Sequence, residues 1–381
     1  MPIKIIIIII IIILLLYTLP YFYLRIKHNF WFYQPVSHYY NLLLPRGYIT
    51  STIPKIYDNK NYHITNIDIT DDKLIKLWLL LLKNSYIPIK NDYVSYHISS
   101  SFLLWSLGTQ LDKYILLSIT KDNKLIGTIT SREINIQINN NQLQLLYVDY
   151  LCVDSNHRKN GLAQMLISNM AHAGLKKNYR AFIFKKEIYP LPYHYICNYM
   201  THIININDIN DNISFKKANI NYKYVLLTEK SSQKEIEDCF VYYQNHSHKF
   251  KLYQSYNLEE FIFYFISSKH TYSYCIYDTS NGSISGLVIL FDSQFEYNKQ
   301  KSLELYLYLR EEENNFNIIF HILTSLNHKY SYIYIPDIGY NNEILDNISN
   351  LKTDEGNMNY IHLYNYHEYK LNPRDIILSF F

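Results

Sequence analysis

The sequence predicts an α/β (α+β) protein built from two lobes, and three observations support that prediction. The chain has 381 residues, which is more than a single typical domain. Hydrophobic residues make up 48% of it and charged residues 18%, a composition that favours a sizeable core over disorder. Alternating apolar runs, typical of strands, lie next to stretches with apolar residues at helical spacing. Such mixed elements pack as sheets covered by helices.

Composition also narrows the function. The net charge of +3 is close to neutral, so we expect no nucleic-acid partner. The cysteines are scattered without paired spacing, which fits a reducing compartment and predicts no metal site and no resident cofactor. We interpret Cys152 as a small apolar core residue. His246 and His248 stand two apart, a spacing that suits a metal on a strand but that favours histidines in a solvated loop.

Residues 1–24 predict a transmembrane anchor. Ile5 to Leu16 is an unbroken apolar run, which later apolar residues extend to about 20 positions, enough to cross a bilayer at about 1.5 Å per residue. No small-x-small cleavage site precedes residue 30, which disfavours a signal peptide and leaves a merely biased isoleucine tract as the alternative. We expect a single-pass helix in contact with the membrane through residues 5–24. The rest of the chain is expected to face the cytoplasm, although the flanking charges are too even to set the orientation.

The chain that follows divides into four expected parts. Residues 25–60 form an aromatic clasp and a connection, residues 61–204 the first lobe, residues 205–222 an Asn- and Asp-rich linker, and residues 223–381 the second lobe. In the first lobe Asp71 caps a helix and Ser99 caps another. Strands are predicted at 114–120, 125–131, 134–138, 142–153 and 181–188.

The second lobe is predicted to repeat the layout of the first. Residues 235–265 are mainly helical in pattern, and 272–277 with 284–291 predict a hairpin. This hairpin resembles the one at 114–131, because Gly127 and Gly286 occupy the same place in each. The likeness suggests an internal duplication, although any two hairpins share some features.

The stretch from Leu145 to Ile167 organises the first lobe. A buried strand leads into a basic turn that opens a helix at Leu162. Gly161 lets that turn close tightly, and the free N–H groups of a helix start beside two cations form an anion site. The turn has the pattern R-x-x-G-x-A, which is that of the pyrophosphate loop in GNAT-type acyltransferases. A solvated basic loop is the alternative.

Short motifs along the chain resemble the protein N-myristoyltransferase family. Tyr150-Leu151-Cys152-Val153 is similar to its F-L-C-V segment, and Phe30-Trp31 opens a stretch similar to its F-W-x-x-Q-P-V. Further matches, in the same order, are Phe102 to Leu107, Lys124 to Gly127, Gly356 to Tyr360 and Leu363 to Tyr366. The resemblance covers roughly 350 residues and implies two tandem GNAT-type lobes related by a pseudo-twofold. The first lobe would bind acyl-CoA and the second mainly the peptide.

The resemblance also implies a reaction and its residues. The family moves a myristoyl group from coenzyme A to an N-terminal glycine by direct attack, so acyl-CoA and glycine-initiated peptides are the expected partners. No nucleophile motif such as G-x-S-x-G occurs, which agrees with direct attack. The oxyanion site would be the backbone N–H groups of Tyr150 and Leu151, and the base the C-terminal carboxylate of Phe381. A buried edge strand is the alternative for this apolar end. The implied acyl-CoA residues are Asn29, Phe30, Trp31, Leu151, Cys152, Val153, Arg158, Lys159, Asn160, Gly161, Leu162 and Ala163.

The chain departs from the family near the reacting amine. The Asn before F-L-C-V is Asp149, and the Thr that handles the amine would be Phe184, followed by Lys185 and Lys186 where the family has small residues. One basic residue of the phosphate loop is lost. These departures leave open a second class of function, an inactive module that binds acyl-CoA or acylated peptide at a membrane.

Overall fold

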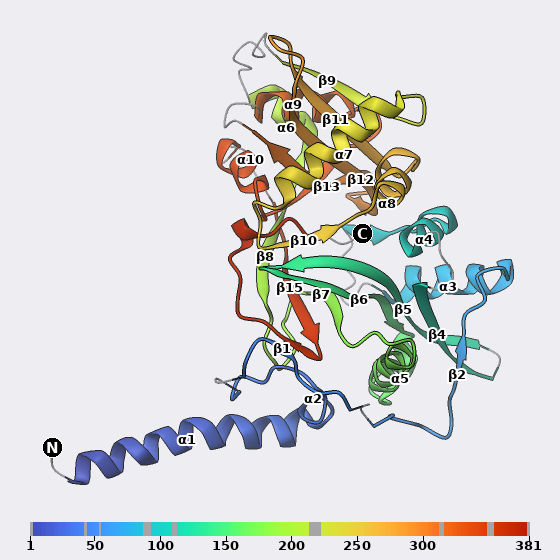
Figure 1. Ribbon diagram of the computed structural model, residues 1–381. Helices are drawn as coiled ribbons and strands as arrows, with labels where there is room; N and C mark the ends of the chain where they lie inside the picture. Colours follow the sequence, from blue (N-terminus) through green and yellow to red (C-terminus); the bar gives the residue numbers. More distant parts are fainter. Residues whose placement is uncertain are drawn as a thin grey trace.

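The computed structural model describes residues 3–41, 44–52, 55–86, 93–108, 113–122, 124–212, 222–311, 316–348 and 354–378. These residues form one 14-stranded sheet and a separate two-stranded pair, with helices on both faces of the large sheet (Figure 1). The predicted α/β class is therefore confirmed.

The helices are α1 (Ile3–Lys27), α2 (Asn29–Phe32), α3 (Asp72–Ser85), α4 (Ser100–Leu107), α5 (Leu162–Lys176), α6 (Ile206–Asn212), α7 (Gln233–Ser247), α8 (Leu258–Phe261), α9 (Phe316–Ser325) and α10 (Asn341–Asn347). The strands are β1 (Gly47–Tyr48), β2 (His63–Asn66), β3 (Val94–Tyr96), β4 (Tyr114–Lys121), β5 (Lys124–Ile138), β6 (Asn141–Val153), β7 (Phe182–Glu187), β8 (Cys197–Asn205), β9 (Tyr222–Leu227), β10 (Leu252–Ser255), β11 (Thr271–Asp278), β12 (Ile284–Tyr297), β13 (Gln300–Arg310), β14 (Tyr332–Pro336), β15 (Asp354–Tyr364) and β16 (Tyr366–His367).

The strand order of the large sheet reads alike from both ends. It runs β2-β4-β5-β6-β7-β15-β8-β14-β13-β12-β11-β9, so β2 to β7 in one half correspond to β9 to β14 in the other. At the centre the halves exchange strands: β8 lies beside β14, and β15 lies beside β7. Two short strands also pair with the opposite half of the sheet: β10 of the second half pairs with β5, and β3 of the first half pairs with β12. This order supports the predicted pairing of two similar lobes.

The two hairpins that suggested a duplication share a register. Gly127 on β5 lies opposite Ile119 of β4, and Gly286 on β12 lies opposite Ile276 of β11. In both pairs the register shifts at the next residue of the first strand. A Cβ at Gly127 would come 3.3 Å from the Leu166 side chain, and one at Gly286 would come 3.1 Å from Ile276, so each glycine permits close packing at the same place.

Alternation along the strands divides the core between the two sheet faces. On β4, Leu116 packs in the cluster that contains Trp78 of α3 and Phe102 of α4, while its neighbours Ile115 and Leu117 pack in the cluster formed with α5. The first cluster continues across to α7 and α8, so four helices share one face. The opposite face is covered by α5 in the first half and by α9 in the second.

Helix starts follow the predicted caps. The Asp71 side chain accepts hydrogen bonds from the N–H groups of Lys73 and Leu74 at the start of α3, and Ser99 accepts from the N–H of Phe102 at the start of α4. One detail of the prediction was wrong, because β5 is one strand of 15 residues rather than two separate ones. The stretch 235–265 is mainly helical, as predicted, and it also contains β10, which was not predicted and which pairs with the far end of β5.

The predicted membrane anchor is wrong. Among the residues that the structure describes, no helix has both the length and the apolar character needed to cross a membrane. The apolar run does form a helix, α1, whose last turn carries Arg25 and Lys27 and packs on protein. There Leu24 is 4% exposed, and the Tyr21 ring contacts the Phe32 ring of α2. Three predictions that depend on the anchor are therefore also wrong: the single-pass topology, the membrane contact through residues 5–24 and the membrane localisation.

The predicted boundaries at residues 24, 60, 204 and 222 stay a prediction. β8 ends at Asn205, where the linker was predicted to begin, and α6 occupies the first part of that segment. Residues 213–221 of the predicted linker lie outside the described residues.

Candidate active site

The F-L-C-V-like segment forms a β-bulge. Thr128 of β5 lies opposite Cys152 and Thr130 lies opposite Asp149, so two residues of β6, Tyr150 and Leu151, share one place in the ladder. Tyr150 has a φ of +47°, unusual for a bulky residue. The threonine hydroxyls hold the bulge from inside: Thr128 donates to the Tyr150 carbonyl and Thr130 to the Asp149 carbonyl, each at 3.1 Å. The bulge is therefore fixed in place, as an oxyanion site requires.

The two N–H groups expected to form that site differ in their surroundings. The backbone N–H of Tyr150 donates to Oδ1 of Asp149 at 2.7 Å. The next residue, Leu151, is 39% exposed. The pairing of both N–H groups as oxyanion donors stays a prediction, and the Tyr150 N–H is available only if the Asp149 carboxylate turns away from it.

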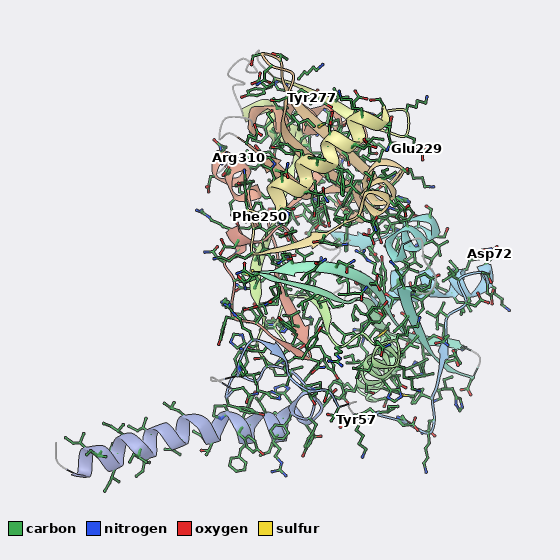
Figure 2. The ribbon with its side chains drawn as sticks, viewed as in Figure 1. Tyr57, Asp72, Glu229, Phe250, Tyr277 and Arg310 are labelled. Atoms are coloured by element: carbon green, nitrogen blue, oxygen red, sulfur yellow. The ribbon has the colours of Figure 1, made fainter. Side chains whose placement is uncertain are left out.

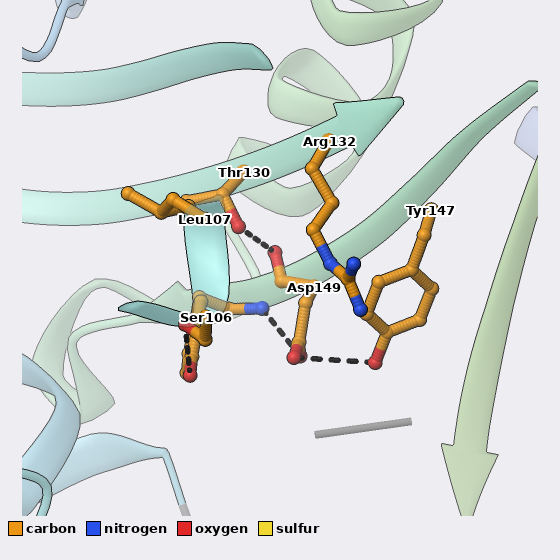
Figure 3. A pocket seen from close by; sticks show the side chains of 7 residues that line it. Ser106, Leu107, Thr130, Arg132, Tyr147 and Asp149 are labelled. Atoms are coloured by element: carbon orange, nitrogen blue, oxygen red, sulfur yellow. Dashed lines mark hydrogen bonds between the residues drawn. The ribbon is translucent and has the colours of Figure 1, made fainter. Parts of the chain in front are cut away.

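A small hollow adjoins the bulge (Figure 3). Asp149 lies in its wall, and both carboxylate oxygens are bonded: Oδ1 also accepts from the Tyr86 hydroxyl at 2.9 Å, and Oδ2 accepts from the Tyr147 hydroxyl at 3.2 Å. Arg132 enters the same wall from β5 and donates to the Tyr264 hydroxyl at 3.1 Å. The lining residues are Ser106, Leu107, Thr130, Arg132, Tyr147, Asp149 and Tyr150.

The Asp149 carboxyl has a shifted pKa. Burial raises its pKa above the usual range, and hydrogen bonds from the Tyr150 N–H and the Tyr86 hydroxyl partly offset the rise by favouring the charged form. The ammonium of Lys185 on β7 also lowers the Asp149 pKa, because it favours the charged form. An aspartate in this setting is a stronger base than one on the surface.

The basic loop between β6 and α5 has the form expected of an anion site. Lys159 and Gly161 have φ values of +67° and +76°, and Gly161 stands at the helix start with no side-chain hydrogen bond to the first turn. The N–H groups of that turn thus keep their donors for a ligand. Arg158 is exposed yet bound to the protein, donating from Nε to the Val153 carbonyl and from Nη2 to the Ser85 carbonyl. Of the other predicted residues, Asn160 is exposed, Leu162 is buried and Ala163 is half-buried.

The aromatic clasp lies against the same helix. Phe30 of α2 is buried and its ring contacts the Tyr57 ring at 5.3 Å. The Tyr57 backbone N–H in turn donates to the Ser168 hydroxyl of α5 at 2.9 Å, and its hydroxyl donates to the Asn29 side chain at 3.5 Å. Figure 2 shows Tyr57 where the clasp meets the first lobe. Trp31 packs against Tyr193. The structure therefore brings the predicted clasp residues and the basic loop to one helix.

Cys152 and the histidines do not provide a nucleophile or a metal site. Cys152 is 2% exposed, and burial raises its thiol pKa to about 12, so the prediction of a core residue is confirmed. His246 stacks on Tyr242, and His248 bonds to the hydroxyl of Tyr253. No group of three His, Cys, Asp or Glu residues in the described part of the chain has the arrangement of a metal site.

The residue predicted to act as base, Phe381, lies outside the described residues. The last residues that are described run into the core. Ile376 and Leu378 are fully buried, and the N–H of Ile377 donates to the carbonyl of Leu252 at 3.0 Å. The role of the Phe381 carboxylate stays a prediction.

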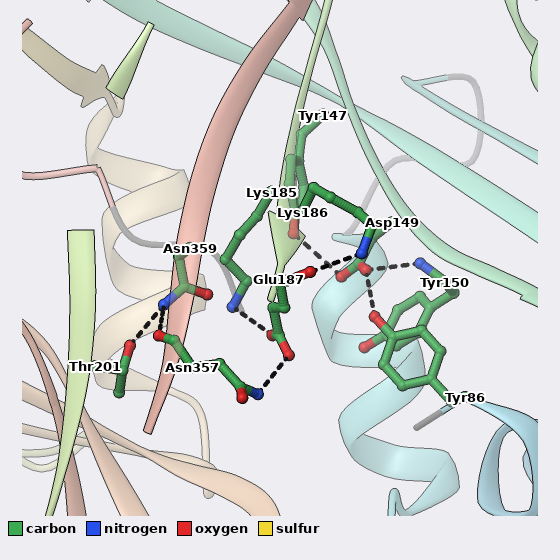
Figure 4. Close-up of polar contacts among 10 residues, drawn as sticks. All are labelled: Tyr86, Tyr147, Asp149, Tyr150, Lys185, Lys186, Glu187, Thr201, Asn357 and Asn359. Carbon is green, nitrogen blue, oxygen red and sulfur yellow. Dashed lines mark hydrogen bonds and ion pairs between the residues drawn. The ribbon is translucent and has the colours of Figure 1, made fainter. Parts of the chain in front are cut away.

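The departures on β7 belong to a polar network that reaches the centre of the sheet (Figure 4). Lys185 forms an ion pair of 3.5 Å with Glu187, which accepts from Asn357 of β15 at 3.3 Å. Phe184 stacks on His362, the residue opposite it on β15. The Lys186 ammonium donates to the Glu187 carbonyl at 2.6 Å, so both lysines have partners on β7.

Four residues near the bulge were not predicted: Ser106, Arg132, Tyr86 and Tyr147. Arg132 had a signal, since it stands with Glu133 as a charged pair in the middle of a long strand pattern. Tyr86 had none, because its contact with Asp149 spans 63 positions of sequence and depends on where α3 ends.

Comparison with known proteins identifies relatives. Residues 51–194 match the family model described as Myristoyl-CoA:protein N-myristoyltransferase, N-terminal domain. The chain is 22% identical to glycylpeptide N-tetradecanoyltransferase of Kluyveromyces lactis over 297 residues, which are 71% of this chain and 65% of that relative, slightly less than two thirds. It is 24% identical to glycylpeptide N-tetradecanoyltransferase of Plasmodium falciparum over 159 residues, 39% of each chain.

The fold has close counterparts among solved structures. The crystal structure of Saccharomyces cerevisiae N-myristoyltransferase with bound myristoyl-CoA superposes with a TM-score of 0.75 at 15% identity, covering 91% of this chain and 94% of that one. A second structure of that enzyme, with bound myristoyl-CoA and inhibitors, gives 0.74 and 94% coverage of this chain. The chain is thus similar to N-myristoyltransferases in sequence over part of its length and in fold over nearly all of it.

Proposed function

We propose that this relative of the N-myristoyltransferases is an acyltransferase that moves a fatty acyl group from coenzyme A to the N-terminal glycine amine of a protein. The observation that supports it best is the sequence of features on one strand, loop and helix: a fixed bulge at Tyr150, then a basic loop, then an uncapped helix start at Gly161. The helix start and Lys159 suit the phosphates of coenzyme A, and the bulge suits the thioester carbonyl. Myristoyl-CoA is the expected co-substrate, with no resident cofactor.

The proposed chemistry is direct attack of the amine on the thioester. Cys152 is excluded as a nucleophile because its thiol is buried and protonated at neutral pH. The Leu151 N–H, joined by that of Tyr150 once it is released, would stabilise the oxyanion, a contribution of several kcal/mol in comparable sites. The C-terminal carboxylate of Phe381 is proposed as a base within this reaction.

A second candidate function is supported by one contact. Asp149 occupies the Tyr150 N–H and places a carboxylate beside the expected oxyanion, which would disfavour negative charge there. A protein of this kind would bind acyl-CoA without turning it over.

One assay separates the two. The full chain is incubated with myristoyl-CoA and the peptide Gly-Ala-Ala-Ala amide, and free thiol and peptide mass are followed. Acyl transfer predicts release of one thiol for each peptide whose mass rises by one myristoyl group, and none with the N-acetylated peptide. Binding of myristoyl-CoA without thiol release would instead support the binding module.

A further inference from the structure

Three donors hold the Asp149 carboxylate. The Tyr150 N–H and the Tyr86 hydroxyl donate to Oδ1, and the Tyr147 hydroxyl donates to Oδ2 (Figure 4). These donors come from three places in the chain, the bulge itself, the end of α3 and the strand before the bulge. Hydrogen bonds of this kind favour the ionised carboxylate. Oδ2 accepts from the Tyr147 hydroxyl, and a carboxylate oxygen can accept from a second donor as well.

The hollow beside Asp149 fits a small group. Its cavity volume is about 10 Å³, which is room for one water-sized group. Its wall contains the carboxylate and the bulge side by side, since Asp149 directly precedes Tyr150. A group seated here lies next to the place where the thioester carbonyl is expected. The ammonium head of a terminal glycine is close to a water molecule in size and has the charge to occupy this hollow.

We propose that Asp149 binds the ammonium of the incoming amine and takes its first proton, an inference that rests on the proposed acyl transfer. The amine enters as R–NH3⁺, and one proton passes to the Asp149 carboxylate. The freed lone pair forms the N–C bond as the carbonyl π bond becomes an oxyanion. The nitrogen then carries two protons and a positive charge. Loss of one of these protons to a second base, and breakage of the C–S bond with the electron pair leaving on sulfur, gives the amide and the thiolate of coenzyme A, which takes up a proton.

Two proton transfers from one nitrogen explain why two carboxylates are useful. The first transfer needs a base that already faces the bound ammonium, which is the position of Asp149 in the hollow. The second occurs after attack and suits the proposed Phe381 carboxylate. A base acts by position first and by pKa second.

The charges around Asp149 are consistent with an ionised but basic carboxylate. The groups that face it from neighbouring elements are the hydroxyls of Tyr86, Tyr96, Tyr147 and Tyr150 and the cations of Arg132 and Lys185. Burial raises the Asp149 pKa, which strengthens the base, while the donors and Lys185 act against burial by favouring the charged form.

The test uses Asp149→Asn in the full chain at pH 7 and pH 9. Asparagine keeps the shape and an oxygen for the Tyr150 N–H, but it cannot take a proton. An amine of pKa about 8 is roughly one tenth neutral at pH 7 and nine tenths neutral at pH 9, so a base for its first proton becomes dispensable at high pH. We expect kcat to fall about a hundredfold at pH 7 and only about tenfold at pH 9, with myristoyl-CoA affinity unchanged. Asp238→Asn, at an exposed site on α7, is the matched control and should match the unaltered chain at both values.

A second variant tests the role of the Asp149 carboxylate through the pH dependence of kcat, without removing the carboxylate. Tyr86→Phe deletes a donor to Oδ1, so it should raise the Asp149 pKa. Because the ionised form is the base and exists above that pKa, the acid limb of kcat should move to higher pH. An equal loss in Asp149→Asn at pH 7 and pH 9, or an Asn variant faster than the unaltered chain, overturns the proposal. So does an acid limb that stays in place in Tyr86→Phe.

Binding distinguishes failure of this proposal from failure of the proposed function. If the unaltered chain releases no thiol at either pH, the acyl transfer fails and binding alone decides the role of Asp149. Gly-Ala-Ala-Ala amide should then bind at least tenfold tighter than its N-acetylated form at pH 7, and Asp149→Asn should remove the difference. Equal binding of the two peptides by the unaltered chain overturns the ammonium site.

Discussion

The guanidinium of Arg158 donates a 2.6 Å hydrogen bond to the backbone carbonyl of Ser85, the last residue of α3. The contact places a cation at the negative end of that helix dipole and fixes the basic loop to the first lobe. Arg158 therefore uses two of its N–H donors within the protein. Lys159 is also exposed, and its backbone has a positive φ. The two residues should behave differently when removed.

Lys159→Ala should weaken myristoyl-CoA binding without changing stability. We expect a loss of about tenfold at low salt, shrinking as ionic strength rises, because a phosphate contact made by an exposed cation is screened. Arg158→Ala should also lower the melting temperature, since it removes two bonds to backbone carbonyls. Titration calorimetry at two salt concentrations and thermal unfolding measure both, with Lys234→Ala on α7 as the control. Unchanged affinity for Lys159→Ala at low salt would remove the anion site.

Truncation of α1 should show where its contribution lies. Ile5 to Ile12 are each 41 to 54% exposed, while Leu24 is 4% exposed and Tyr21 packs on Phe32. A chain beginning at residue 20 should keep the melting temperature of the full chain. A chain beginning at residue 28 should lose packing worth about 2–4 kcal/mol at the clasp and bind myristoyl-CoA more weakly. Equal stability of the two truncated chains would mean that α1 does not support the clasp.

Extending the C-terminus by one glycine should reduce turnover about a hundredfold, because it moves the terminal carboxylate by about 3.5 Å. In contrast to the Asp149→Asn variant, this loss should be equal at pH 7 and pH 9, since the second proton is removed only after attack. Myristoyl-CoA affinity should not change. A glycine-extended chain as active as the unaltered one would exclude the Phe381 carboxylate.

The stability of the protein should fall in mild acid through His362. Burial lowers its pKa to about 3, and its Nε2 accepts a hydrogen bond from the Leu191 N–H, which requires the neutral ring. The folded-state pKa lies below the unfolded value of about 6.5, so the contribution is complete above pH 6.5 and decreases as pH falls toward 3. The free energy of unfolding should drop by about 1.4 kcal/mol per pH unit from this residue.

Urea unfolding at pH 7 and pH 5 measures that drop. His362→Phe keeps an aromatic ring against Phe184 but cannot titrate, so its stability should change less between the two pH values. His328→Ala, at an exposed site, should keep the full pH dependence. A variant at 362 that follows the unaltered chain would show that other groups carry the effect.

Local signals in the sequence predicted the parts of the site that depend on local chemistry. The helix start at Gly161 was located because a glycine marks it. The caps Asp71 and Ser99 were located by their residue types, which favour helix starts. Attention to Tyr150 and Leu151, where the bulge lies, came from the resemblance to the F-L-C-V motif and not from local chemistry.

Contacts between distant segments could not be predicted in this way. β10 was missed because its partner, the end of β5, is over a hundred residues away and its own run is only four residues long. The bonds from Tyr86 and Tyr147 to Asp149 were missed for a related reason: hydroxyl direction depends on packing, which periodicity does not describe. The apolar run at the N-terminus correctly predicted the helix α1, but the prediction that this helix crosses a membrane was wrong.

The exchange of β8 and β15 has a consequence for synthesis of the chain. β7 ends at Glu187 and its neighbour β15 begins at Asp354, so 166 residues must be translated before the strand gains its partner. At about 5–20 residues per second, that edge stays open on the ribosome for roughly 10 to 30 seconds. An open edge invites pairing with other nascent chains, and charged residues discourage it. Lys185 and Lys186, which stand where small residues were expected, would then protect the growing chain from aggregation together with the neighbouring Glu187.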